Sequence, residues 1–264
     1  MNRDVSAHIA LTVTEPADLV FSVAVAAGHD ADETLRVSVD GVEAPVDEVR
    51  DAHGTRLHRV RAQTGSLLLD YNAAIRGRAV AERADAADPI RYLRPSRYAE
   101  SDVLAPTAAA EFGGIEHAAD LLAAVSSWVG THLMYVPGSS LPTDGAERTL
   151  LARQGVCRDY AHLCVALLRA SGIPARLAAV YAPGLDPMDF HAVAEAWVDD
   201  AWCVVDATTL APRDTLVRIA TGRDAADTAF LTVQSGRADL DTVEVTAVAD
   251  ELPTDDITRL VPIG

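Results

Sequence analysis

Apolar and polar residues alternate along much of the first eighty residues of the chain. Alternation with a period of two is typical of a strand with one buried face, and turn residues such as Asp40-Gly41 separate the runs. The runs lie at Val5–Val13, Leu19–Val25, Leu35–Val39, Arg56–Val60 and Leu67–Tyr71. Short strands at this spacing predict a small antiparallel β-sandwich over residues 1–80. Four histidines are scattered through this region, and we expect surface or edge positions for His8, His29, His53 and His58.

Residues 81–114 are rich in signals that interrupt regular structure. Asp88-Pro89, Arg94-Pro95 and Gly113-Gly114 are such breakers, and the stretch 92–102 is unusually rich in Tyr, Arg and Pro. A plain disordered linker is not expected to have that composition. We therefore interpret residues 81–114 as a connector that packs along the surface of the domain that follows it.

From about residue 115 the hydrophobic pattern changes to the period of a helix, about 3.6 residues. Leu121 and Val125 lie on one apolar stripe of a helix that starts near His117. A second helix opens at Cys157 and ends at Ser171-Gly172, just before a proline, which is a standard stop signal. Between them a shorter helix is predicted, because Asp144 and Glu147 form a pair that resembles a capping box.

Strands are expected after the helix that opens at Cys157. They lie at Ala175–Tyr181, His191–Val198, Trp202–Asp206 and Thr242–Val248. Because the helices come first and the strands follow, the sequence favours an α+β domain with a mainly antiparallel sheet over residues 115–264.

Composition and charge narrow the classes of function. The chain has 264 residues, of which 49% are hydrophobic, so it can bury a sizeable core. Its net charge of −17 disfavours nucleic acid and anionic membrane surfaces as partners, because both attract clustered basic side chains. No apolar run approaches the ~20 residues that cross a bilayer, and Met1–Val5 lacks a secretory signal, so a cytoplasmic location is expected. The sequence predicts no cofactor, and it leaves the oligomeric state open.

The chain has three cysteines, Cys157, Cys164 and Cys203. A small and odd number of cysteines in a chain of this length does not indicate a disulfide framework. Cys157 follows Gly155-Val156 at the first turn of a predicted helix, where the partial positive charge of the helix terminus stabilises an anion. The N–H groups at that terminus can also face an oxyanion. Cys164, in mid-helix, and Cys203, on an inward strand face, have the positions of small buried hydrophobes. Cys157 is therefore the candidate nucleophile.

His191 and Asp206 lie on consecutive predicted strands that are joined by Asp199-Asp200, a tight-turn signal. If those two residues form the loop, Val198 opposes Ala201 and His191 is the diagonal neighbour of Asp206. If the loop is shifted by one residue, His191 opposes Asp206 directly. Both registers bring the carboxylate to the imidazole, as in a general base held by an acidic residue. Glu195 shares the face of His191 by alternation, and we expect it to be a structural partner of Arg176.

Several segments together resemble the bacterial transglutaminase-like superfamily. Gly155–Leu163 (GVCRDYAHL) is similar to the nucleophile helix of that family, and Gly172–Arg176 to the segment that follows it. Asp189–Ala192 resembles the histidine strand and Val205–Thr208 the aspartate motif, in the family's order Cys, His, Asp. The resemblance covers nearly the whole chain, because the early β region and two flanking motifs, Tyr92–Tyr98 and Ile219–Asp227, look like one bacterial subgroup.

The resemblance implies a transglutaminase-like cysteine peptidase or amidase with a papain-like core, in which the nucleophile helix packs on an antiparallel sheet. It implies Cys157 as nucleophile, His191 as base and Asp206 as the residue that orients the base. The expected reaction is hydrolysis of a peptide or isopeptide bond, in a peptide or protein substrate, through a thioester. Three alternatives stay open: transfer to an amine, as in crosslinking transglutaminases, a non-catalytic binding module on the same fold, and a zinc site at the same three residues.

Overall fold

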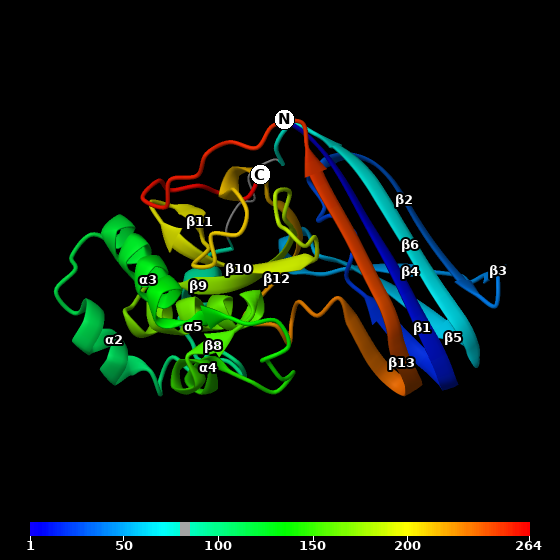
Figure 1. Cartoon of the computed structure of the whole chain (residues 1–264), viewed down its shortest axis with the longest axis horizontal. Coiled ribbons are helices and arrows are strands. Elements are labelled where there is room, and N and C mark those ends of the chain that lie inside the picture. The colour runs from blue at the N-terminus through cyan, green and yellow to red at the C-terminus, as the bar shows by residue number, and fades with distance from the viewer. Residues whose placement is uncertain (80–84) are drawn as a thin grey trace.

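The computed structural model describes residues 1–79 and 85–264, which form a large sheet, a small sheet and a group of helices. In Figure 1 the small sheet lies between the helices on the left and the large sheet on the right. The large sheet has seven strands in the order β3-β2-β6-β1-β5-β4, with β13 on the remaining side of β1. The strands are β1 (Asn2–Phe21), β2 (Asp30–Val39), β3 (Val42–Glu43), β4 (Asp47–Arg50), β5 (Arg56–Ala62), β6 (Gly65–Arg76) and β13 (Leu231–Ala249).

Strand β1 is the spine of the large sheet. It runs through the two segments that the sequence predicted as separate strands, because a β-bulge near Glu15–Asp18 lets it bend without ending. Its first part pairs with β6 and its last part with β5, while β13 follows its other side from Arg3 to Phe21. At the bend of β13, Gly236 has a φ of +75° and a Cβ there would lie 2.0 Å from the Pro16 carbonyl oxygen. Only glycine fits this close approach.

The sandwich predicted for residues 1–80 is not confirmed. The strands of residues 1–79 form one curled sheet, and its seventh strand comes from the C-terminal part of the chain. The predicted Thr242–Val248 segment is the end of β13, so it belongs to this sheet and not to the one that follows the Cys157 helix. Pattern alone could not show this, because the alternation of a strand does not identify its partner.

The small sheet is antiparallel, in the order β11-β10-β9-β12, and the most buried helix, α5, packs on β9 and β10. Its strands are β9 (Ala175–Tyr181), β10 (Phe190–Val198), β11 (Ala201–Val205) and β12 (Val217–Gly222). The helices are α1 (Asp88–Arg91), α2 (Ala105–Phe112), α3 (Ala118–His132), α4 (Ala146–Ala152) and α5 (Cys157–Ala170). Two short strands, β7 (Met134–Tyr135) and β8 (Gln154–Gly155), pair in parallel just before α5, and 3₁₀ turns lie at Ala52–Gly54 and Arg213–Thr215. None of the helices within residues 1–79 and 85–264 is long and apolar enough to span a membrane.

The α+β class with antiparallel strands after the helices is confirmed. Helix α5 starts at Cys157, α3 starts one residue after His117, and β9 has the predicted bounds. The capping prediction for α4 is wrong: its N-cap residue is Gly145, and the carboxylate of Glu100 accepts the hydrogen bond from the Ala146 N–H at 2.8 Å. The cap comes from a residue distant in sequence, which a local motif cannot reveal.

The predicted connector packs against the core as expected. The Tyr92 carbonyl accepts a hydrogen bond from the Ala175 N–H of β9, and the Arg94 carbonyl accepts one from the Arg169 guanidinium of α5. Residues 80–84, where the predicted boundary between the first domain and the connector falls, lie outside the described residues. The division at residues 80 and 114 stays a prediction.

Two arginines, one buried and one partly buried, meet one buried carboxylate at the centre of the small sheet. Glu195 of β10 accepts hydrogen bonds from Arg176 of β9 at 2.9 Å and from Arg218 of β12 at 2.6 Å. Burial raises the pKa of Glu195, but the charges of Arg176 and Arg218 and their hydrogen bonds lower it more, to about 2. The structural role expected for Glu195 is confirmed, and the same carboxylate links three strands.

Glu195→Gln should lower the free energy of unfolding by about 3–5 kcal/mol, because it removes the charge that compensates two guanidinium groups inside the protein. Chemical denaturation followed by circular dichroism measures the change. Glu244→Gln, at an exposed position of β13, removes the same charge from the surface and is the matched control. An equal, small effect of both substitutions would show that the buried network does not stabilise the sheet.

Candidate active site

Cys157 is the first residue of α5 and is half-buried. The turn before it is held by Asp159, whose carboxylate accepts hydrogen bonds from the Val156 N–H at 2.8 Å and from the Ser140 hydroxyl at 2.9 Å. Gly155 is required here, since a Cβ at this position would lie 2.7 Å from the Cβ of Asp159. The thiol is thereby fixed at the N-terminus of a buried helix, where an anion is stabilised.

The hairpin of β10 and β11 brings His191 to Asp206. Asp199 and Asp200 have φ values of 51° and 58°, as the two central residues of a type I′ turn do, so Val198 pairs with Ala201. This is the first of the two registers considered from the sequence, and it is confirmed. Nε2 of His191 lies 2.9 Å from Oδ2 of Asp206, and both residues are buried.

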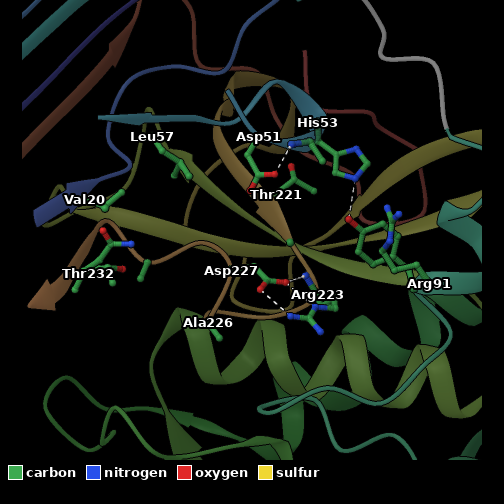
Figure 2. A pocket seen from close by; sticks show the side chains of 15 residues that line it. Val20, Asp51, His53, Leu57, Arg91, Thr221, Arg223, Ala226, Asp227 and Thr232 are labelled. Atoms are coloured by element: carbon green, nitrogen blue, oxygen red, sulfur yellow. Dashed lines mark hydrogen bonds and ion pairs between the residues drawn. The ribbon is translucent and has the colours of Figure 1, made fainter. Parts of the chain in front are cut away.

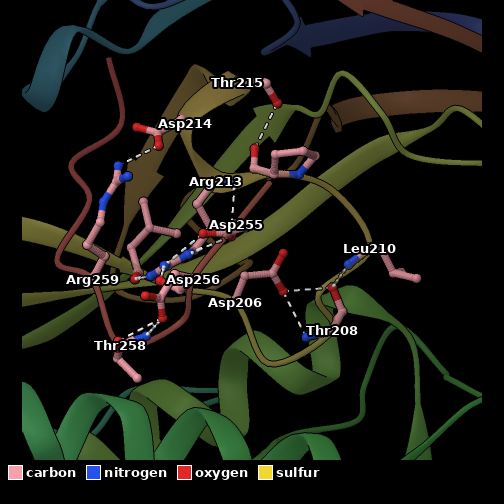
Figure 3. Close-up of polar contacts among 12 residues, drawn as sticks. Asp206, Thr208, Leu210, Arg213, Asp214, Thr215, Asp255, Asp256, Thr258 and Arg259 are labelled. Atoms are coloured by element: carbon pink, nitrogen blue, oxygen red, sulfur yellow. Dashed lines mark hydrogen bonds and ion pairs between the residues drawn. The ribbon is translucent and has the colours of Figure 1, made fainter. Parts of the chain in front are cut away.

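Thr208 holds the other oxygen of the Asp206 carboxylate. Its N–H and its hydroxyl both donate to Oδ1, at 2.9 Å and 2.7 Å (Figure 3). Burial raises the pKa of Asp206, but the His191 charge, the hydrogen bond from His191 and the two bonds from Thr208 lower it more, so the group stays ionised. Thr208 was not singled out from the sequence as a partner of Asp206, although its position two residues away is typical of an Asx turn.

His191 faces two groups through its two ring nitrogens. Nδ1 makes no hydrogen bond within the described part of the chain, and Cys157 is the thiol close enough to interact with the ring. Burial lowers the pKa of His191, but the charge and hydrogen bond of Asp206, followed by the interactions with Cys157, raise it to about 10. The Asp206 carboxylate therefore favours the protonated form of the imidazole.

Tyr135 is a further residue beside the thiol, and the sequence did not point to it. It pairs with Gly155 in the two-residue contact of β7 with β8. Partial burial followed by the Cys157 charge raises the pKa of Tyr135 to about 12, so the phenol and the thiol influence each other. A two-residue parallel contact has no periodic pattern, so the sequence contains no signal for this neighbour.

The other two cysteines and the acidic residues do not form a second centre. Cys164 and Cys203 are buried, as expected. Within residues 1–79 and 85–264, no group of three or more His, Cys, Asp or Glu side chains is arranged to hold a metal ion. The expectation for the histidines is wrong in part, because His58 is buried and the side chain of His53 lies under Tyr92, which hydrogen-bonds to its Nε2 at 2.8 Å.

Two cavities flank the segment 223–229. One, of about 490 Å³, opens at Cys157 and His191. The other, of about 510 Å³, lies on the far side of the segment, and Figure 2 shows its labelled side chains. Its conspicuous charges are paired within the protein: Arg223 binds both oxygens of Asp227 at 2.9 Å and 3.0 Å. The first cavity is therefore the candidate substrate site, because it contains the predicted reactive residues.

Comparison with known proteins identifies the family to which this fold belongs. Residues 106–207, which include Cys157, His191 and Asp206, match the transglutaminase-like superfamily. The crystal structure of a "Putative Cysteine Protease" from Cytophaga hutchinsonii is similar over 100% of this chain and 93% of that chain, with a TM-score of 0.86 and 32% sequence identity. The chain belongs to the transglutaminase-like superfamily.

Two mycobacterial relatives match part of the chain. An uncharacterized protein of Mycobacterium leprae is 32% identical over 138 residues, which are 48% of this chain and 50% of that protein. An uncharacterized protein of Mycobacterium tuberculosis is 34% identical over 124 residues, 41% of this chain and 39% of that protein. The chain thus spans half or less of the length of these curated relatives.

Cys157 should be alkylated by iodoacetamide at pH 7 faster than Cys164 or Cys203 in the native protein. Burial raises the pKa of Cys164 far above its usual value, and burial followed by the charge of Glu195 raises the pKa of Cys203 to about 11. Each unit of such a rise removes about tenfold of the reactive thiolate. Peptide mapping after brief labelling measures the three rates, and urea-unfolded protein is the control in which they should converge. Equal labelling of the three thiols in native protein would contradict the assignment.

Proposed function

We propose that the protein is a cysteine-nucleophile enzyme that hydrolyses a peptide or isopeptide bond through a thioester intermediate. The observation that supports this most is the buried hydrogen bond of His191 with Asp206, beside a half-buried thiol at the start of α5. A charged, desolvated His–Asp pair is costly to bury, and its position beside a thiol at a cavity mouth suits catalysis. The proposal includes a papain-like arrangement of the α5 helix on the small sheet, as the sequence resemblance implied.

The reaction would proceed in two steps, acylation of Cys157 and hydrolysis of the thioester. The Cys157 sulfur attacks the amide carbonyl, a C–S bond forms, and the electron pair of the C=O moves to oxygen. The C–N bond then breaks as the His191 imidazolium gives its proton to the leaving amine, which leaves an acyl thioester. Water attacks the thioester while His191 accepts a proton, and the C–S bond breaks to return the thiolate.

The negative oxygen of the tetrahedral intermediate needs donors that are already in place. The N–H groups at the start of α5, that of Cys157 among them, point out of the helix end and are suited to this. The hydroxyl of Tyr135, which pairs with Gly155 two residues before Cys157, is the side chain that we propose as the second donor. An acceptor amine in place of water would turn the same thioester into a crosslink, so product analysis decides between hydrolysis and transfer.

Cys157→Ala should abolish turnover of an amide substrate, His191→Ala should cost nearly as much, and Asp206→Asn should cost less. In a serine protease triad the loss of the aspartate costs about 10⁴ in rate, because the imidazole takes the wrong tautomer. A thiolate–imidazolium pair is already charged, so its dependence on the carboxylate should be smaller.

The effects should not add, because the three residues act as one unit. Hydrolysis of a fluorogenic peptide library by the three single variants and by Cys157→Ala/Asp206→Asn gives the comparison, with circular dichroism to confirm folding. Turnover near the wild-type rate in Cys157→Ala would end the covalent mechanism and favour a binding module instead.

Tyr135→Phe should lower kcat by about 10²–10³, the usual cost of one oxyanion donor, and change KM little. Alkylation of Cys157 by iodoacetamide involves no oxyanion, so its rate should change far less than kcat. Tyr160→Phe is the control, since the ring of Tyr160 lies 5.9 Å from that of Tyr135. A parallel fall in kcat and alkylation rate would show that Tyr135 acts on the thiol and not on the intermediate.

A further inference from the structure

Apolar side chains from both sheets line most of the cavity at Cys157, and Arg158 and Asp189 add charged groups to its lining. Leu177 and Ala179 of β9, Phe190 of β10 and Ile219 of β12 come from the small sheet. The opposite side is lined by Phe230, Leu231, Leu240 and Val243, which belong to β13 or directly precede it. The strand that closes the large sheet at the edge of β1 therefore forms one wall of the space in front of the thiol.

A β-bulge in β13 directs two of these side chains to the same side. Ala10 of β1 pairs with Thr242, but the next residue, Leu11, pairs with Leu240, so Asp241 is the extra residue. Leu240 and Val243 are three apart and would point to opposite faces of a regular strand. The bulge places both beside the inward residues Leu11 and Ile9, while the Asp241 carboxylate accepts a hydrogen bond from the Thr12 hydroxyl at 2.8 Å.

The loop at the end of the cavity is held in a fixed place. Phe230 stacks on Phe190 with ring centroids 5.4 Å apart, and its carbonyl accepts a hydrogen bond from the Ser22 N–H at 3.0 Å. Earlier in the same loop, the Ala225 N–H donates a hydrogen bond to Nε2 of His162 on α5 at 3.1 Å. The cavity is thus preformed by contacts between the two sheets and α5.

Leu240 is unusual among the lining residues because it is 48% exposed, although it lies on the inward face of the sheet. An apolar side chain that faces an open cavity beside a nucleophile gains contact area when an apolar ligand enters. The cavity volume of about 490 Å³ is large enough for an aromatic or branched side chain.

We propose that this cavity binds an apolar, aromatic or branched, side chain of the substrate next to the amide that Cys157 attacks, and that β13 sets this preference. The inference rests on the proposed function of Cys157 and deepens it by naming the substrate class. It also assigns a role to the large sheet, which holds β13 in register and thereby completes the substrate site.

The test compares two uncharged alkylating agents with the same reactive group, N-(2-phenylethyl)iodoacetamide and N-(2-carbamoylethyl)iodoacetamide. Wild-type Cys157 should react faster with the phenylethyl reagent by about tenfold or more, the usual effect of a filled apolar pocket. Leu240→Asp should remove this preference, and the near-isosteric Leu240→Asn should reduce it. Iodoacetamide itself, which has no tail, gives the intrinsic reactivity of Cys157 in each variant, so the rates of the two tailed reagents are compared after division by its rate. Circular dichroism reports whether each variant is folded.

Val248→Asp is the matched control. Val248 is also on β13 and is 45% exposed, but it pairs with Asp4 on the outward face of the sheet. It should keep the wild-type preference. Equal rates of the two reagents in the wild type, or a preference that survives in Leu240→Asp, would overturn the proposal.

A binding measurement separates this proposal from the chemistry of the thiol. Cys157→Ala should bind N-acetylphenylalaninamide in a saturable manner by calorimetry, and Leu240→Asp in the same background should weaken that binding by about tenfold. If Cys157→Ala binds this ligand and the added Leu240→Asp weakens the binding, the pocket is supported. If Cys157 of the wild type is at the same time unreactive, the proposed enzyme is contradicted while the pocket stands. The absence of binding in Cys157→Ala would overturn the pocket whatever the thiol does.

Discussion

The antiparallel pairing of β10 with β11 is the contact on which the candidate site depends. A slip of one strand by a single residue against the other would put His191 and Asp206 on opposite faces of the sheet. A one-residue shift of the loop, by contrast, changes each pairing by two residues and keeps them on one face. The slip is prevented by the turn, because Asp199 and Asp200 both adopt a positive φ that only this loop geometry requires. It is also opposed by Glu195 on the same strand, which two arginines hold from neighbouring strands. The Glu195 network therefore also keeps His191 in register with Asp206.

The large sheet contributes to the candidate site through β13, which pairs with β1 along most of its length and lines the cavity at Cys157. The two strands come from opposite ends of the chain, so β13 joins the sheet only when residues more than two hundred positions apart meet. Arg3 of β1 reinforces the closure from inside, where its guanidinium donates to the carbonyls of Gly77, Leu216 and Gly264. The apolar inner face of the sheet then packs on β9 and β12, behind which α5 presents the thiol.

The sequence predicted the parts of this architecture that local pattern determines. The start of α5 at Cys157, the bounds of β9 and the His191–Asp206 approach all follow from periodicity, stop signals and turn residues within short segments. What it missed depends on partners distant along the chain. The cap of α4 by Glu100, the position of Tyr135 beside the thiol and the membership of β13 in the first sheet are set by tertiary packing. The comparison with the family adds the fold, whereas the roles of the site residues are argued from their geometry.

The central claim is that Cys157 forms an acyl thioester, and direct trapping tests it. The chain contains no lysine, so few other side chains compete for an acylating reagent. The protein would be mixed with the p-nitrophenyl ester of N-acetylphenylalanine, quenched in acid and mapped by mass spectrometry of its peptides. The account predicts one acetylphenylalanyl group on the peptide that contains Cys157, removed by neutral hydroxylamine and absent from Cys157→Ala. Release of p-nitrophenol at the same rate by Cys157→Ala, with no acyl group on the thiol of the wild type, would contradict it.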